Sequence, residues 1–244
     1  MTSTTYVRYE LVRVLRNRRF FLFSLGFPLV LYFLVAGPNR DVHDLGGSGV
    51  SAPLYFMIGL TAFGAMNSVI AGGARIAFDR SVGWTRQLRL TPLSPRSYLV
   101  TKILTAYLTA LITVVVLAAA GASLGVHLSA SVWAETIALL LIGLLPFAAL
   151  GILFGHLLTV DSLGPAVGGT TALLAFLGGV WFPIQSGFMH TVAQALPSYW
   201  LVQASRVATG GHAWGVRGWA ITVAWTIVLG AAAAWAYRRD TERA

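Results

Sequence analysis

Long apolar segments alternate with short polar ones along the chain, and this pattern predicts the architecture. A membrane-crossing helix needs about 20 mostly apolar residues. Six segments meet this requirement, at about residues 20–36, 53–72, 98–121, 133–157, 163–182 and 216–237. We therefore expect an all-α integral membrane protein with six transmembrane helices, built as a single domain over residues 1–244.

The segment 184–211 is also apolar, but polar side chains and Pro197 interrupt it. We predict two short helices, about 186–195 and 198–209, that dip into the outer leaflet and return, because such backbone is tolerated when it packs against protein. A plain interfacial loop is the alternative. We interpret this outer hairpin as a gate, in which Tyr199 and Trp200 suit the headgroup region. Arg206 either pairs with Glu135 of the fourth span or is hydrated.

An amphipathic element precedes the first span, at residues 5–19. Val7, Leu11 and Val14 recur at helical spacing, and Arg13 and Arg16 lie on the opposite face. This pattern predicts a helix on the inner membrane surface, with Thr4 or Thr5 as its N-cap.

Composition and charge support a membrane protein and orient it. Charged residues make up 10% of the chain, against roughly 25% in soluble globular proteins, which excludes an ordinary soluble fold. The net charge is +9, and fourteen basic residues flank the spans on one side against three on the other. The positive-inside rule then places both termini in the cytoplasm of a multi-pass protein of the inner (plasma) membrane, and no nucleic-acid partner is needed to explain the charge.

A cleavable signal peptide competes with an uncleaved first span for the N-terminal segment. We favour the uncleaved span because Pro28 interrupts the apolar run and Leu34 is too large for the small-x-small cleavage pattern.

The loop 79–95 carries the most specific signal. Ser81 can cap a short helix in which Trp84 and Leu88 share a face, and Pro92 should end that helix near Leu90. The connection is far longer than two spans require, and with its Trp and arginines it indicates a binding surface. A loop that rests on lipid is the alternative.

This loop resembles the cytoplasmic signature of type-2 ATP-binding-cassette exporter permeases. The matching residues are Asp79–Arg80, Gly83–Trp84–Thr85, Leu88, Thr91–Pro92–Leu93–Ser94–Pro95 and Lys102. The outer segment Leu196–Trp200, followed by Arg206, is similar to the hairpin between the fifth and sixth spans of that family, and daunorubicin-type drug-export permeases are the branch suggested by chain length.

The resemblance implies a coupling helix that docks on a separate ATP-hydrolysing subunit, an N-terminal elbow helix, and a pathway formed with a second permease chain, identical or not. It implies coupling roles for Asp79, Arg80, Trp84, Arg86, Leu88, Arg89 and Pro92. The cargo would be an amphipathic or hydrophobic compound moved outward.

The sequence lacks the motifs of ATP hydrolysis and metal catalysis. A P-loop needs a Gly-Lys followed by Ser or Thr, whereas Lys102, the sole lysine, lies between Thr101 and Ile103. Cysteine is absent and the five histidines lack metal-ligand spacing. We therefore expect no cofactor in this chain, with ATP and Mg²⁺ held by the partner subunit.

Two other classes of membrane protein fit the sequence less well. A secondary transporter is disfavoured because no carboxylate falls at mid-membrane depth. A rhomboid-type intramembrane serine protease would use Gly46–Gly47–Ser48–Gly49, but that motif lies in a glycine-rich loop rather than at the head of a buried helix.

The transport pathway is expected along one face of the second span, formed by Phe56, Phe63 and Asn67, because lipid would penalise the Asn67 amide. Thr170 and Thr171 of the fifth span are further lining candidates. Ordinary helix packing is the alternative for each of these residues.

Overall fold

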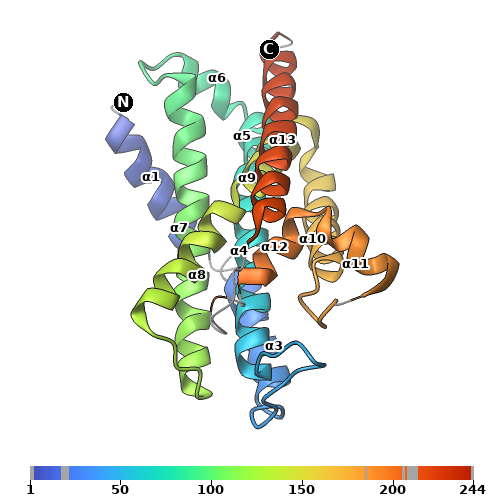
Figure 1. The fold of residues 1–244 in the computed structure, drawn as a ribbon. Coiled ribbons are helices and arrows are strands. Elements are labelled where there is room, and N and C mark those ends of the chain that lie inside the picture. Colours follow the sequence, from blue (N-terminus) through green and yellow to red (C-terminus); the bar gives the residue numbers. More distant parts are fainter. Residues whose placement is uncertain (1–2, 18–21, 185, 205–206, 208–213, 243–244) are drawn as a thin grey trace.

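The computed structural model describes residues 3–17, 22–184, 186–204, 207 and 214–242, and the regular elements within them are helical (Figure 1). In chain order they are α1 (Ser3–Leu15), η1 (Leu22–Gly26), α3 (Phe27–Ala36), α4 (Ala52–Ala74), α5 (Ile76–Ser81), α6 (Trp84–Arg89), α7 (Pro95–Ser123), α8 (Ala130–Gly143), α9 (Leu145–Leu157), α10 (Val160–Leu177), α11 (Gly187–Gln194), α12 (Pro197–Gln203) and α13 (Val216–Glu242).

Five helical segments in the described residues are long and apolar enough to cross a membrane. They are Ala52–Ser81, Pro95–Ser123, Ala130–Leu157, Val160–Leu177 and Val216–Asp240. The predicted first span is represented by a shorter apolar helix, Ser24–Ala36, and residues 18–21 at its start lie outside the described part. Its first turn, η1, is π-helical and continues directly into α3, where Pro28 cannot donate a backbone hydrogen bond to the preceding turn.

The predicted fourth span is two helices, α8 and α9, that meet at Leu144. Pro146 lies at the start of α9, where a missing N–H and the proline ring interrupt a continuous helix. Together the two helices form one candidate membrane span, Ala130–Leu157, which contains the predicted span at 133–157.

Helix α4 is the centre of the bundle, because nearly all of its residues are buried against neighbouring helices. Glycines let the backbones approach closely there. A Cβ at Gly151 of α9 would meet the Ile70 carbonyl oxygen of α4 at 2.5 Å, and one at Gly73 would meet the Gly151 carbonyl carbon at 2.6 Å. The Gly151–Gly155 spacing in the sequence therefore serves packing within the chain.

Both ends of the chain lie at the same end of the bundle as α6, whereas α3 and the loop after it lie at the opposite end (Figure 1). Ion pairs join α1 to Asp79 of α5, and Asp240 of α13 to Arg80 of α5. We call this the α6 end of the bundle.

The predicted hairpin 184–211 contains two short helices, α11 and α12, partway along the bundle in Figure 1. Helix α12 begins at Pro197 as expected from the preference of proline for the first helical turn. It ends at Gln203, before the predicted end, and residues 205–206 and 208–213 lie outside the described part.

Candidate functional site

Helices α5 and α6 follow each other closely at the α6 end, and we call them together the α5–α6 turn. Gly83 between them has φ +69°, a left-handed conformation that glycine adopts without steric cost. The Thr91 hydroxyl donates to the Leu88 carbonyl at 2.7 Å and closes the end of α6. Ser94 then caps α7 by accepting a hydrogen bond from the Ser97 N–H. The helix ends near Leu90 as predicted, but Ser81 does not cap it: Ser81 is the last residue of α5, and its hydroxyl donates to Phe78.

The face shared by Trp84 and Leu88 is turned toward the protein. Leu88 is 7% exposed and packs with Tyr6 of α1 and Tyr98 of α7, and the half-buried Trp84 ring lies 6.4 Å from that of Tyr9. In this arrangement Leu88 stabilises the position of α6 instead of offering a contact surface.

The outward surface of this turn consists of other residues. Arg86, Gln87 and Pro92 are exposed, and two large apolar side chains protrude, Val82 at 67% and Leu90 at 90% exposure. The side chain of Arg89 lies outside the described residues. Two large apolar side chains beside polar ones therefore face away from the protein at this end.

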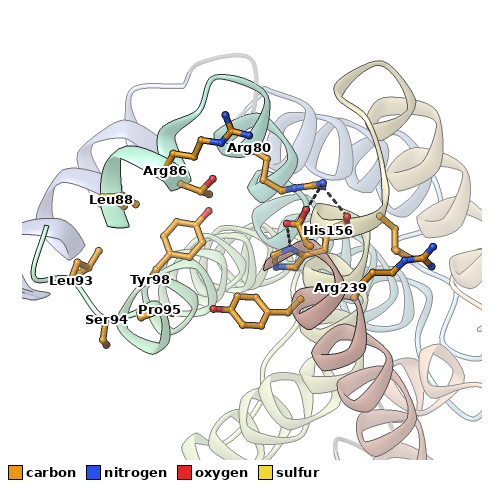
Figure 2. A pocket seen from close by; sticks show the side chains of 14 residues that line it. Arg80, Arg86, Leu88, Leu93, Ser94, Pro95, Tyr98, His156 and Arg239 are labelled. Atoms are coloured by element: carbon orange, nitrogen blue, oxygen red, sulfur yellow. Dashed lines mark hydrogen bonds and ion pairs between the residues drawn. The ribbon is translucent and has the colours of Figure 1, made fainter. Parts of the chain in front are cut away.

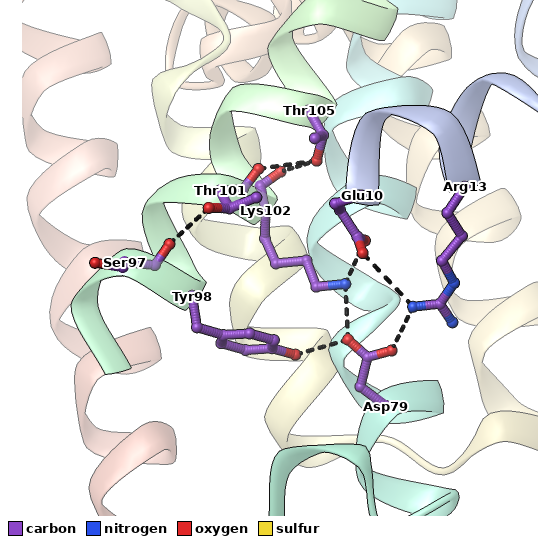
Figure 3. A network of polar contacts seen from close by, with 8 residues as sticks. All are labelled: Glu10, Arg13, Asp79, Ser97, Tyr98, Thr101, Lys102 and Thr105. Atoms are coloured by element: carbon purple, nitrogen blue, oxygen red, sulfur yellow. Dashed lines mark hydrogen bonds and ion pairs between the residues drawn. The ribbon is translucent and has the colours of Figure 1, made fainter. Parts of the chain in front are cut away.

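A cluster of charged side chains is buried directly behind this turn (Figure 3). Asp79 of α5 is fully buried and accepts hydrogen bonds from Arg13 Nη1 at 2.9 Å and from the Tyr98 hydroxyl at 2.9 Å. The Lys102 ammonium of α7 lies 2.7 Å from the Asp79 carboxylate and 2.5 Å from that of Glu10 of α1. We call these five residues, Glu10, Arg13, Asp79, Tyr98 and Lys102, the charge cluster.

The charge cluster holds three separate elements, α1, α5 and α7, in one arrangement. Glu10, Asp79 and Lys102 are each at most 1% exposed. Buried ions of this kind are tolerated because they are paired, and removal of one partner leaves an uncompensated charge. Asp79 therefore joins α5 to α1 and α7, and its side chain does not reach the surface of the 79–95 loop.

The electrostatic surroundings also affect the α1 side chains that face the cluster. Burial, with the negative charges of Glu10 and Asp79, raises the pKa of the Tyr6 hydroxyl. Partial burial opposes the charge of Arg13, but its hydrogen bond to Asp79 outweighs this and raises the pKa of the guanidinium. Both groups thus keep their protonated forms near neutral pH.

Arg80 forms a second connection, from α5 to the ends of two long helices. Its guanidinium donates to the carbonyls of Gly155 and His156 at the end of α9 and lies 2.7 Å from Asp240 of α13. Free carbonyls and the helix dipole make the end of a helix a favourable place for a cation. The Arg80 connection, together with the charge cluster, attaches the α5–α6 turn to α1, α7, α9 and α13.

The sequence analysis missed Glu10, His156 and Asp240 and gave Lys102 and Arg13 no partner. A signal was available in the sequence, since Tyr6, Glu10 and Val14 lie on one face of α1 at four-residue spacing, and all three are buried. Because a buried carboxylate needs a positively charged partner, Glu10 on the buried face of α1 could have been paired with Lys102, the sole lysine.

The predicted pathway residues are packed against helices of this chain. Phe56 is buried, Phe63 lies with its ring 6.1 Å from Phe27 and 5.7 Å from Trp181, and Asn67 Nδ2 contacts the Ser24 hydroxyl at 3.5 Å. On α10, Thr170 is half-buried, and Thr171 is buried with no hydrogen-bond partner for its side chain in the described residues. The structure therefore does not bring the two sets together around a cavity in the described part of one chain.

The predicted outer-gate residues divide into two groups. Pro197, Tyr199 and Trp200 are buried, and the Trp200 indole donates to the Gln194 carbonyl at 3.1 Å, so that α12 is held against α11. Glu135 is exposed on α8, and its proposed partner Arg206 lies outside the described residues.

The described residues contain no group of three or more His, Asp or Glu side chains that could hold a metal ion. Ser48 lies in the loop before α4, and its hydroxyl is hydrogen-bonded to the backbone of Val50, which gives no support to a nucleophilic serine.

Comparison with known proteins agrees with the resemblance of the 79–95 loop. Residues 38–235 match the family described as ABC-2 family transporter protein. The chain is also similar to YvfS of Bacillus subtilis (strain 168), named as a candidate transport permease, with 31% identity over 195 residues that cover 78% of each chain.

Proposed function

The chain belongs to the ABC-2 family of transporter proteins, and from that premise we propose how it works: as the permease subunit of an exporter whose energy comes from a separate ATP-hydrolysing subunit. The observation that carries the proposal is the α5–α6 turn at one end of a membrane bundle. Ion pairs attach it to α1, α7 and α13, and hydrogen bonds from Arg80 attach it to α9. No observation favours a protease or a secondary transporter.

We propose that the α6 end is cytoplasmic and that six spans cross the inner membrane, with Ser24–Ala36 as the first. Support comes from the concentration of basic residues beside this end and from the shared location of the two termini, which requires an even number of crossings. In this orientation α1 is the elbow helix at the inner surface, and α11–α12 is a re-entrant hairpin that caps the pathway from outside.

We propose that the ATPase docks on the outward surface of α6, formed by Val82, Arg86, Gln87, Leu90 and Pro92. Closure of the nucleotide-bound ATPase dimer would push α6, and the charge cluster and Arg80 would carry that displacement into the long helices as a rigid-body movement. ATP and Mg²⁺ would be held by the ATPase, because this chain has no P-loop.

We further propose that two permease chains enclose the pathway and that the cargo is an amphipathic or hydrophobic compound. The proposal of a partner chain is supported by α10 and α13. Only 22% and 17% of their apolar stretches are buried within the described part of one chain. The residues Phe63 and Asn67 would then line the pathway only in a state where α3 moves away from α4.

The test is purification of the tagged chain with identification of the proteins that accompany it, followed by ATP-dependent export from cells. Leu90→Glu should remove the ATPase from the purified complex and abolish export while membrane insertion is retained. Arg96→Gln, an exposed arginine at the same end, is the matched control and should change neither. Full co-purification and export with Leu90→Glu would contradict the proposed docking surface.

A further inference from the structure

A cavity of about 550 Å³ opens at the α6 end, between α6, the start of α7 and the ends of α9 and α13 (Figure 2). Its lining is mixed: Leu88, Leu93 and Leu157 lie beside the rings of Tyr98 and Tyr237, and charged and polar side chains form the rest. This volume falls in the range of small-molecule binding sites. The mixture of apolar and charged side chains suits a ligand that has both an apolar and a charged part.

The charges around the cavity do not cancel. Arg80, Arg86, Arg239 and Asp240 all line it, and Arg80 and Asp240 neutralise each other at 2.7 Å. Arg86 has no ion-pair partner among the described residues, and Arg239 lies over the Trp235 ring at 5.4 Å. Two cationic groups therefore stand on opposite sides of this cavity (Figure 2).

A buried polar group also lacks a partner in this cavity. His156 is 8% exposed, and its Nδ1 lies 3.0 Å from Asp240. Its other ring nitrogen, Nε2, is buried with no hydrogen-bond partner in the described part of the chain. Because buried polar atoms are nearly always hydrogen-bonded, an orphan atom in a lining residue points to a ligand or bound water.

We propose that this cavity binds an anionic amphiphile, with its phosphate or carboxylate between Arg86 and Arg239 and its apolar part against Leu93, Leu157 and Tyr237. Such a molecule has two sources: a phospholipid of the adjacent leaflet, or an anionic amphiphile from the aqueous side. Bound there, it would contact both α6 and α13, beside the Arg80–Asp240 ion pair that joins α5 to α13. This inference concerns binding by the permease alone and does not depend on an ATPase or on transport.

The test uses the absence of cysteine in the chain. A single cysteine placed at Thr85, which lines the cavity, is labelled with an environment-sensitive fluorophore in phosphatidylcholine nanodiscs and titrated with oleoyl lysophosphatidate. We expect a saturable signal that oleoyl lysophosphatidylcholine and inorganic phosphate reproduce at least tenfold more weakly. Equal affinity for either comparison compound would overturn the proposal, because it would remove the need for the anionic or the apolar part.

Two variants make the assignment specific. The double variant Arg86→Gln with Arg239→Gln should weaken lysophosphatidate binding about thirtyfold, since each arginine near an anionic lipid contributes about fivefold to the affinity. Arg96→Gln, an exposed arginine at the same end that does not line the cavity, should leave binding unchanged. Unchanged binding in the double variant, with its fold checked by gel filtration, would overturn the proposal.

The source of the ligand is separated by competition. Nanodiscs that contain phosphatidylglycerol should block lysophosphatidate binding if the site takes a membrane phospholipid, whereas octyl phosphate added to the solution should compete if the site takes an amphiphile from the aqueous side. Either result supports an anionic amphiphile, and failure of both to compete would overturn it.

Discussion

Lys102 of α7 and Glu10 of α1 form an ion pair 2.5 Å long in which both side chains are 1% exposed. The pair joins residues 92 positions apart in the sequence. Asp79 adds a second carboxylate to the same ammonium, so that one lysine contacts both α1 and α5 from α7.

Loss of the Lys102 charge should therefore destabilise the protein strongly. Lys102→Met leaves two buried carboxylates with too little positive charge, and we expect a cost of about 3–5 kcal/mol and a large fall in thermal stability in detergent. Combining it with Glu10→Met should recover part of the loss, because one of the uncompensated charges is removed. If the double variant is no more stable than Lys102→Met, the charge cluster does not act as described.

An added methyl group should destabilise the protein at a glycine of α9 but not at a glycine of α10. A Cβ at Gly151 would meet the Ile70 carbonyl oxygen at 2.5 Å, whereas a Cβ at Gly168 of α10 meets nothing within 4 Å. Gly151→Ala should cost about 1–3 kcal/mol through overpacking, and Gly168→Ala should be neutral or slightly stabilising. Thermal unfolding of both variants in the same detergent checks this, and equal effects would contradict the packing of α9 on α4.

The Arg80–Asp240 pair should contribute measurably to the attachment of α13. Arg80→Gln also removes hydrogen bonds to Gly155 and His156, so we expect a loss of about 2–3 kcal/mol, against about 1 kcal/mol for Asp240→Asn. A double-mutant cycle should give a coupling energy of about 0.5 kcal/mol or more. Strict additivity would mean that the pair does not hold α13 to α5.

Topology can be tested with single cysteines, since the chain has none. Asp41 lies in the exposed loop after α3, and Gln87 lies on the exposed surface of α6. Each is changed to cysteine in a separate variant. In intact cells a membrane-impermeant maleimide should label position 41, and position 87 should react only after permeabilisation. Labelling of position 87 in intact cells would reverse the orientation proposed for the α6 end.

Several elements of the fold were predictable because they depend on local pattern. The long apolar runs gave α4, α7, α10 and α13, and Pro197 marked the start of α12 within the predicted hairpin. Pro92 correctly placed the end of α6. Each of these signals acts within one segment, through apolar length or the geometry of proline.

Other features depended on which elements meet, and this the sequence did not specify. Periodicity placed Trp84 and Leu88 on one face, yet whether that face turned toward α1 or outward followed from the docking of Tyr6 and Tyr98. The exposed Leu90 was missed for the same reason. The division of the fourth span into α8 and α9 was not predicted, because apolar length says nothing about whether a span is one helix or two.

The central claim, that the α6 end receives the ATPase, is tested most directly by site-specific cross-linking in the purified complex. Cysteines at Gln87 and Leu90, and a control cysteine at Arg40 in the loop at the opposite end, would each carry a photoactivated benzophenone. We expect positions 87 and 90 to cross-link to the co-purifying ATPase and position 40 not to do so. Cross-linking from position 40, or none from α6 while the ATPase remains bound, would contradict it.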